Sequence, residues 1–152
     1  MLSKEEVKEL RIDFWGRLEH QMKKLRNPHG SKVNWMNYNT GIKHLYFRME
    51  ADESGARLCI DIQFPDEGIR ALYYEQFEEF KNVLSSKFKT LNWYPKWDHW
   101  NGKEIARIAI EKGGCSLRNT DDWDKMHLFL KLNFVKLDEF WTEFGEVFHN
   151  LK

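Results

Sequence analysis

The alternation of apolar and polar residues between positions 43 and 64 constrains the fold more than any other feature of the chain. Apolar side chains occupy every second position over residues 45–49 and again over residues 58–64. The polar run Asp52-Glu53-Ser54-Gly55 lies between the two segments. A period of two is what a strand with one buried face requires. This stretch therefore predicts a β-hairpin.

The register of this hairpin has two solutions. The two apolar sets share a face only if the numbers of opposite residues sum to an odd value. Pairing Asp52 with Arg57 is the preferred solution, because it places Arg48 opposite Asp61 and forms a cross-strand ion pair. Pairing Glu50 with Arg57 is the alternative, and it stays open.

A second hairpin is predicted around Asn101-Gly102, the dipeptide best suited to a type I′ turn. Placing Trp100 opposite Lys103 puts the apolar residues of both strands on one face, so that the tryptophans point inward. In this register Trp93, Pro95 and Trp97 face Ile110, Ile108 and Ala106. Tyr94, Lys96 and Arg107 lie on the other face, with Lys96 directly opposite Arg107.

Three helical regions flank the hairpins. Ser3 and Glu6 form a capping box at the start of the first, and Pro65-Asp66-Glu67 opens the second, whose apolar stripe reaches Phe88. The third covers residues 120–149, where so great a length predicts a kink or break near Asn133. Residues 33–38 add a short strand or extended segment. The fold class is α+β: a two-layer sandwich, with a largely antiparallel sheet of two hairpins against three helices, in the order α-β-β-β-α-β-β-α.

Composition narrows the class of protein. The 152 residues suit a single domain spanning 1–152. Lysines and arginines number 24 and acidic residues 24, so the formal net charge is zero and the chain is not a strongly basic nucleic-acid-binding domain. No apolar run approaches the roughly 20 residues of a membrane span. Two cysteines and an N-terminus without a secretion signal predict a cytoplasmic protein that does not act at membranes.

Several aromatic motifs are spread over nearly the whole chain. They include Phe14-Trp15, Asn34-Trp35, Tyr46-Phe47-Arg48, Leu72-Tyr73-Tyr74-Glu75-Gln76-Phe77, Ile105-Ala106-Arg107-Ile108, Asp121-Asp122-Trp123 and Phe140-Trp141. In these motifs the chain resembles the short stand-alone bacterial members of domain of unknown function family 4268. Other members of that family carry the domain next to nuclease-like domains. The resemblance implies an association with nucleic-acid metabolism, and it implies no particular activity.

One catalytic hypothesis follows from the order of the elements, which resembles the core of the PD-(D/E)XK nuclease fold. In that reading Glu50 or Asp52 supplies one acid, Asp61 supplies the second, and Gln63 stands where the pattern has a lysine. Paired carboxylates can hold Mg²⁺ for phosphodiester attack. A neutral amide does not supply the charge of a lysine, however. The favoured interpretation is that these acids form surface ion pairs with arginines.

A binding hypothesis rests on aromatic and basic side chains that alternate in the second hairpin, together with an arginine of the first. Rings interleaved with cations are typical of surfaces that stack the bases of a single strand. No histidine or cysteine spacing marks a metal site, and no cofactor is expected apart from Mg²⁺ under the nuclease hypothesis. The candidate binding residues are Arg48, Tyr94, Lys96, Trp100, Lys103 and Arg107.

These observations favour a non-catalytic binding or interaction module over an enzyme. Its expected partner is another protein or a single-stranded nucleic acid. A divergent metal-dependent nuclease is the first alternative. A structural homo-oligomer, such as a homodimer through the last helix, is the second.

Overall fold

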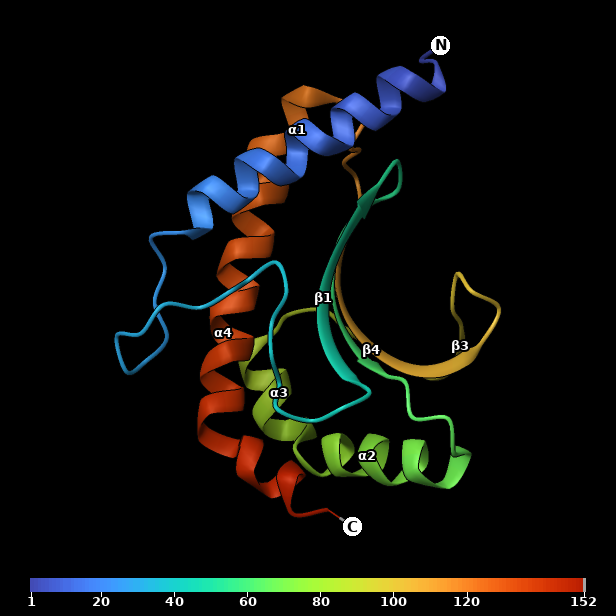
Figure 1. The fold of residues 1–152 in the computed structure, drawn as a ribbon, viewed down its shortest axis with the longest axis vertical. Helices are drawn as coiled ribbons and strands as arrows, with labels where there is room; N and C mark the ends of the chain where they lie inside the picture. Colours follow the sequence, from blue (N-terminus) through green and yellow to red (C-terminus); the bar gives the residue numbers. More distant parts are fainter. Residues whose placement is uncertain (152) are drawn as a thin grey trace.

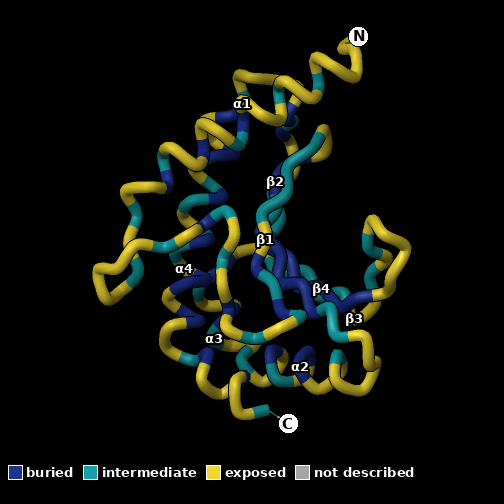
Figure 2. Tube along the Cα trace, in the orientation of Figure 1, coloured by how far each residue is buried: buried dark blue, intermediate teal, exposed yellow. Residues whose placement is uncertain are grey.

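The sheet is antiparallel throughout, and its four strands lie in the order β1-β2-β4-β3. The structure is a computed structural model that describes residues 1–151. The strands are β1 (Leu45–Asp52), β2 (Gly55–Ile62), β3 (Leu91–Asp98) and β4 (Glu104–Lys112). Figure 2 shows the central strands β2 and β4 as mostly buried, whereas the loop that joins β3 to β4 is exposed. The two predicted hairpins are therefore the two halves of one sheet.

Helices cover only one side of this sheet. They are α1 (Lys4–Met22), α2 (Glu67–Glu79), α3 (Lys81–Lys87) and α4 (Trp123–His149), with a short 3₁₀ turn at Thr120–Asp122. Figure 1 shows the sheet curving away from α4 and α2, so that its other face, here called the open face, carries no helix. The α+β two-layer class and the order of elements are confirmed.

Details of the helices differ from the prediction. The predicted second helix is two helices, because Phe80 leaves helical geometry (φ −93°, ψ 14°) and its ring packs on Phe140 and Phe148 of α4. The predicted kink near Asn133 is wrong. The side-chain amide of Asn133 donates to the Phe129 carbonyl (2.8 Å), and α4 runs through without a break. Residues 33–38 belong to no strand of the sheet.

The register of the first hairpin is the alternative one. Glu50 lies opposite Arg57 and Asp52 lies opposite Gly55, so the preferred pairing of Arg48 with Asp61 is wrong. Gly55 explains the difference. Its φ of +139° allows a two-residue connection in place of four, and no other residue type adopts that backbone easily.

The register of the second hairpin also differs from the prediction. Only Gly102 of the Asn101-Gly102 pair has a positive φ (+79°), and its N–H donates to the His99 carbonyl (2.9 Å). The turn is thus type I followed by a left-handed glycine, not type I′. Trp97 consequently faces Ile105, and a bulge between Tyr94 and Trp97 then places Trp93 opposite Ile108.

The bulge separates the two tryptophans that were expected to point inward together. Pro95 lies within it, and a proline has no N–H for the sheet ladder. Trp93 stays on the helix-covered side, edge-on to Tyr74 of α2 (ring centroids 5.9 Å apart). Trp97 is on the open face, and Lys96 does not face Arg107, whose partner in the sheet is Tyr94.

Candidate functional site

The open face of the sheet holds a connected network of ion pairs, centred on Arg107 of β4. Strand pairing places Arg107 opposite Asp61 of β2. Its Nε and Nη2 donate to the two carboxylate oxygens of Asp61 (2.7 and 3.0 Å), and Nη1 and Nη2 donate to Glu50 of β1 (3.2 and 3.0 Å). Arg57 extends the network, because it binds Glu50 (2.9 Å) and also pairs with Asp52.

Burial makes this network costly to disturb. The Asp61 side chain is fully buried, and Arg107 is 2% exposed. Burial alone opposes the charge of Arg107, but its hydrogen bonds to Asp61 and the charges around it raise the pKa of the guanidinium above its ordinary value. Burial likewise opposes ionisation of Glu50, but Arg107 and Arg57 outweigh it and lower the pKa of that carboxyl. Glu50 is therefore held as a charged partner of arginine, whereas burial outweighs the bonds from Arg107 at Asp61 and raises the pKa of that carboxyl.

The acids of the nuclease hypothesis thus lie together, but around a guanidinium. Glu50 and Asp61 both bind Arg107, and Asp52 binds Arg57. Gln63 lies outside the network. Within residues 1–151, no three or more histidine, cysteine or acidic side chains are grouped so that they could hold a metal ion. A divalent cation would have to take the position of the Arg107 guanidinium to bridge these carboxylates.

Aromatic rings cover the arginines of the open face. Trp97 lies against the Arg107 guanidinium (4.9 Å from the ring centroid), and Tyr46 lies against that of Arg48 (4.4 Å). The Tyr94 hydroxyl donates to Glu111 (2.7 Å). Tyr94 and Arg107, both candidate binding residues, therefore already have partners within the protein.

The end of the sheet beside α2 is hollow. A cavity of about 400 Å³ lies where the end of β2 meets the start of β4. Gln63 and Lys103 line it, together with His44 and Arg70. The side-chain amide nitrogen of Gln63 is buried without a hydrogen-bond partner among the described residues. A buried donor of this kind is costly, but because it is closed off from the cavity it does not mark the cavity as an anion site.

The loop beside this cavity carries the most exposed ring of the protein. Trp100 is 87% exposed in the connection between β3 and β4, next to the ring of His99 (centroids 5.8 Å apart). Lys96 is exposed too, but it lines a different hollow, against α2, which also contains Glu67 and Glu75. The structure therefore places Gln63 and Lys103 at one cavity, beside the loop that carries Trp100, and Lys96 at another.

Comparison with known proteins identifies the family. The family model described as "Domain of unknown function (DUF4268)" matches residues 10–146 of the 152. The chain belongs to the DUF4268 family. No curated protein and no solved structure matches it. The resemblance seen in the sequence is thus confirmed over nearly the whole chain.

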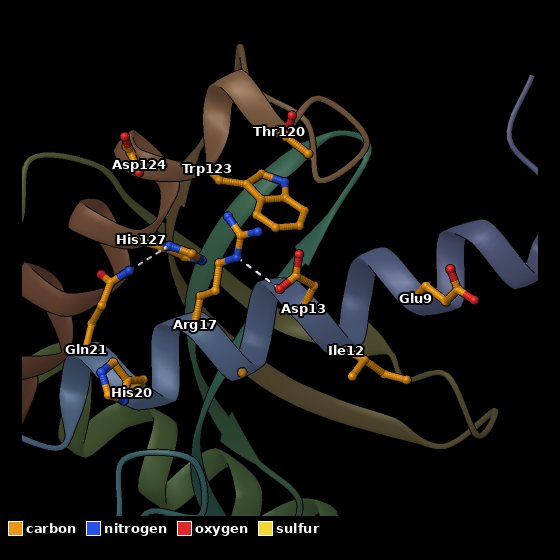
Figure 3. Close-up of a pocket in the computed structure, with 11 residues that line it drawn as sticks. Glu9, Ile12, Asp13, Arg17, His20, Gln21, Thr120, Trp123, Asp124 and His127 are labelled. Atoms are coloured by element: carbon orange, nitrogen blue, oxygen red, sulfur yellow. Dashed lines mark hydrogen bonds and ion pairs between the residues drawn. The ribbon is translucent and has the colours of Figure 1, made fainter.

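Another groove of this DUF4268 domain lies between α1 and α4 (Figure 3). It encloses about 680 Å³ and is lined by eleven residues, among them Arg17, Gln21, Trp123 and His127. Arg17 lies over the Trp123 ring (5.2 Å) and pairs with Asp13 (2.9 Å), as Figure 3 shows. The contact between Arg17 and Trp123 joins the two helices, whereas the pair with Asp13 lies within α1.

His127 is the buried polar residue of this groove. Its Nε2 lies 3.0 Å from the Phe14 carbonyl and its Nδ1 lies 3.3 Å from the Gln21 amide nitrogen. A carbonyl only accepts, so Nε2 carries the proton and Nδ1 accepts from Gln21. A doubly protonated ring would place two donors face to face at Gln21. The neutral ring is therefore the one that fits this site.

We expect His127 to make the protein less stable in mild acid. Burial lowers the pKa of the His127 imidazole below its ordinary value of 6.5. The unfolded chain then binds a proton at a higher pH than the folded protein does. The free energy of unfolding therefore falls as the pH decreases below about 6.5, and it is unaffected by this group above that pH. Urea unfolding at a series of pH values between 5 and 8 measures the slope.

The His127→Gln variant retains a side-chain donor for the Phe14 carbonyl but does not titrate, so its stability should change less with pH over the same range. His20→Gln is the matched control, because His20 is exposed at the edge of the same groove. Equal slopes in the wild type and His127→Gln would contradict the assignment.

A further polar residue, Asp138, lies inside the core, and the apolar pattern of the sequence did not single it out. Asp138 of α4 is 4% exposed and accepts a hydrogen bond from the Tyr38 hydroxyl. Burial, followed by this bond to Asp138, raises the pKa of Tyr38 far above its ordinary value. Both Asp138 and His127 occupy positions of the buried stripe of α4. A polar residue at a position of the apolar stripe of α4 was therefore the signal in the sequence that could have identified these two buried side chains.

No described helix is both long and apolar enough to span a membrane. The prediction of a cytoplasmic location stays a prediction.

Proposed function

We propose that this DUF4268 domain is a non-catalytic module that binds single-stranded nucleic acid. The binding site lies at the end of the sheet beside the β3–β4 loop. The observation that carries the proposal is the position of Trp100, an almost fully exposed ring in the loop whose Lys103 lines a cavity together with Arg70. A base that stacks on an exposed indole is bound without regard to its identity, because every base has an aromatic face.

The cavity supplies basic side chains for the phosphate backbone of the bound nucleic acid. Lys103 and His44 line it, and Arg70 adds a guanidinium, which also pairs with Glu104 (3.4 Å). Because the net charge is zero and Glu104 also lines the cavity, we expect a dissociation constant of roughly 10⁻⁴–10⁻⁶ M, with an affinity that weakens as salt is added.

The nuclease alternative rests on one observation, the shared contact of Glu50 and Asp61 with Arg107. Two carboxylates within reach of one cation are the elements of a Mg²⁺ site. Incubation of labelled single- and double-stranded DNA with the protein and Mg²⁺ tests it directly. Cleavage that is lost in Asp61→Asn would establish the nuclease and overturn the non-catalytic proposal.

Replacing Trp100 by alanine is expected to weaken binding of a fluorescein-labelled oligothymidylate by about fivefold or more. Base stacking on an aromatic side chain contributes about 1–3 kcal/mol, which sets this magnitude. Fluorescence anisotropy at low salt measures the affinity. Lys103→Glu should weaken binding further and reduce its dependence on salt, because one phosphate contact is lost.

The control for this experiment is Ile12→Ala, since Ile12 is an exposed apolar residue on α1, away from the hairpin. Its affinity should equal that of the wild type. Equal affinities for Trp100→Ala and the wild type would remove the hairpin from the binding surface. Absence of any oligonucleotide binding at low salt would reject the nucleic-acid proposal altogether.

A further inference from the structure

The helix α4 carries a second apolar stripe that no other element covers. Its buried stripe faces the core, but Leu128 and Leu132, one turn apart, are 52% and 54% exposed. Together with the half-buried Phe129 they form one wall of a groove of about 620 Å³. The opposite wall comes from the end of β4, where Ile110 and Gly113 line it. This feature is here called the α4–β4 groove.

Lysines surround this apolar strip. Lys125 and Lys136 lie at the two ends of the helical wall, and Lys89 and Lys112 lie on the opposite side. Lys125 pairs with Asp122 (3.3 Å), and the Lys136 ammonium donates to the Lys87 carbonyl (3.2 Å). No ion pair links Lys89 or Lys112 to another described residue.

Among the described residues that line the groove, one acid, Glu111, stands against the four lysines. Glu111 accepts hydrogen bonds from Asn92 (2.6 Å) and Tyr94 (2.7 Å), and Tyr94 is a residue of the open face. The groove therefore combines an apolar wall with a rim of positive charge.

We propose that the α4–β4 groove docks a short acidic amphipathic segment of a partner protein. The two exposed leucines of the groove are one helical turn apart, so they can contact successive apolar side chains of an amphipathic helix that lies in the groove. The lysine rim matches carboxylates on its flanks, and such charge complementarity sets orientation and association rate. The helical wall from Lys125 to Lys136 is about 17 Å long, so the segment has about three turns.

The shape of the site favours this partner over an anionic membrane. A groove lined on both sides receives a narrow ligand, whereas a lipid surface requires a protruding apolar face. The site is also separate from the nucleic-acid surface proposed above, because none of the groove residues lines the cavity beside Trp100. The inference therefore stands or falls independently of that function.

The experiment uses a fluorescein-labelled synthetic peptide of about 16 residues, built of leucine and glutamate so that leucines share one helical face. Fluorescence anisotropy with the full chain should show saturable binding that weakens with salt. Leu128→Ser/Leu132→Ser should weaken it about tenfold or more. The variant Lys89→Glu/Lys136→Glu should weaken binding of the glutamate peptide by a similar factor. It should instead bind a peptide that has lysine in place of glutamate.

Matched controls come from exposed positions on α1. Ile12→Ser and Lys8→Glu change one apolar and one basic side chain outside the groove, and they should leave the affinity unchanged, as should Trp100→Ala. All the changed side chains are exposed, so the variants should fold, and circular dichroism checks this.

Three outcomes would overturn the inference. The first is equal peptide affinity in the wild type and the double leucine variant. The second is binding to phosphatidylserine vesicles in the absence of peptide binding. The third is self-association in sedimentation that Leu128→Ser/Leu132→Ser abolishes, which would make a second copy of the chain the occupant.

Discussion

Replacing Arg107 by methionine is expected to destabilise the protein by about 3–5 kcal/mol, because it leaves a buried carboxylate without its partner. Asp61 is fully buried, and both of its oxygens accept hydrogen bonds from the Arg107 guanidinium. Methionine fills part of the space but neutralises nothing. Urea unfolding followed by circular dichroism measures the loss, which should appear as a lower midpoint with an unchanged slope.

The double variant Asp61→Leu/Arg107→Met is the control for this prediction. Well-packed apolar residues in place of a buried ion pair are often neutral or stabilising, so the double variant should recover most of the lost stability. Glu50 would keep Arg57 as its partner (2.9 Å). A cost below about 1 kcal/mol for Arg107→Met alone, or no recovery in the double variant, would show that the network carries little of the stability.

The sequence predicted the architecture because its two periodicities are strong. Alternation at every second residue predicted both hairpins, and the side chains of Ile60 and Ile62 are fully buried as that pattern requires. The capping box of Ser3 and Glu6 is present at the start of α1. Features that depend on neighbouring residues of the chain could thus be read from it directly.

Register could not be predicted with the same success, because it depends on backbone geometry at single residues. Asn101 does not adopt the positive φ that a type I′ turn requires, and the bulge at Pro95 shifts the pairing again. Each shift by one residue moves a side chain to the other face of the sheet. This is why Trp97 lies over Arg107 and not in the core.

The candidate site shows the same limit more clearly. The favoured pairing of Glu50 with Arg57 agrees with the contact observed, but Asp61 is fully buried, so the interpretation of this acid as part of a surface ion pair is wrong. The sequence paired Asp61 with Arg48, its neighbour within one hairpin. The structure pairs it with Arg107, which is 46 residues away, because β2 lies beside β4. A contact between two hairpins has no local signal in a single sequence.

Replacing Gly55 by alanine is expected to cost at least about 3 kcal/mol, since the backbone and the surroundings of this residue both exclude a side chain. Its φ is +139°, and a Cβ there would lie 2.0 Å from the Lys112 carbonyl oxygen. That oxygen belongs to the backbone at the end of β4, where β2 pairs with it, so the sheet itself would have to move.

The variant Gly102→Ala separates the cost of the positive φ from the cost of the clash with the Cβ. Gly102 also has a positive φ (+79°), but no atom lies within 4 Å of a Cβ built there, so alanine should cost only the left-handed backbone, about 1–2 kcal/mol. Thermal unfolding of both variants measures the difference. If Gly55→Ala is as stable as Gly102→Ala, the backbone at the β2–β4 edge moves easily. A much larger loss of stability identifies the close approach of the two strands as the constraint that requires glycine at the hairpin.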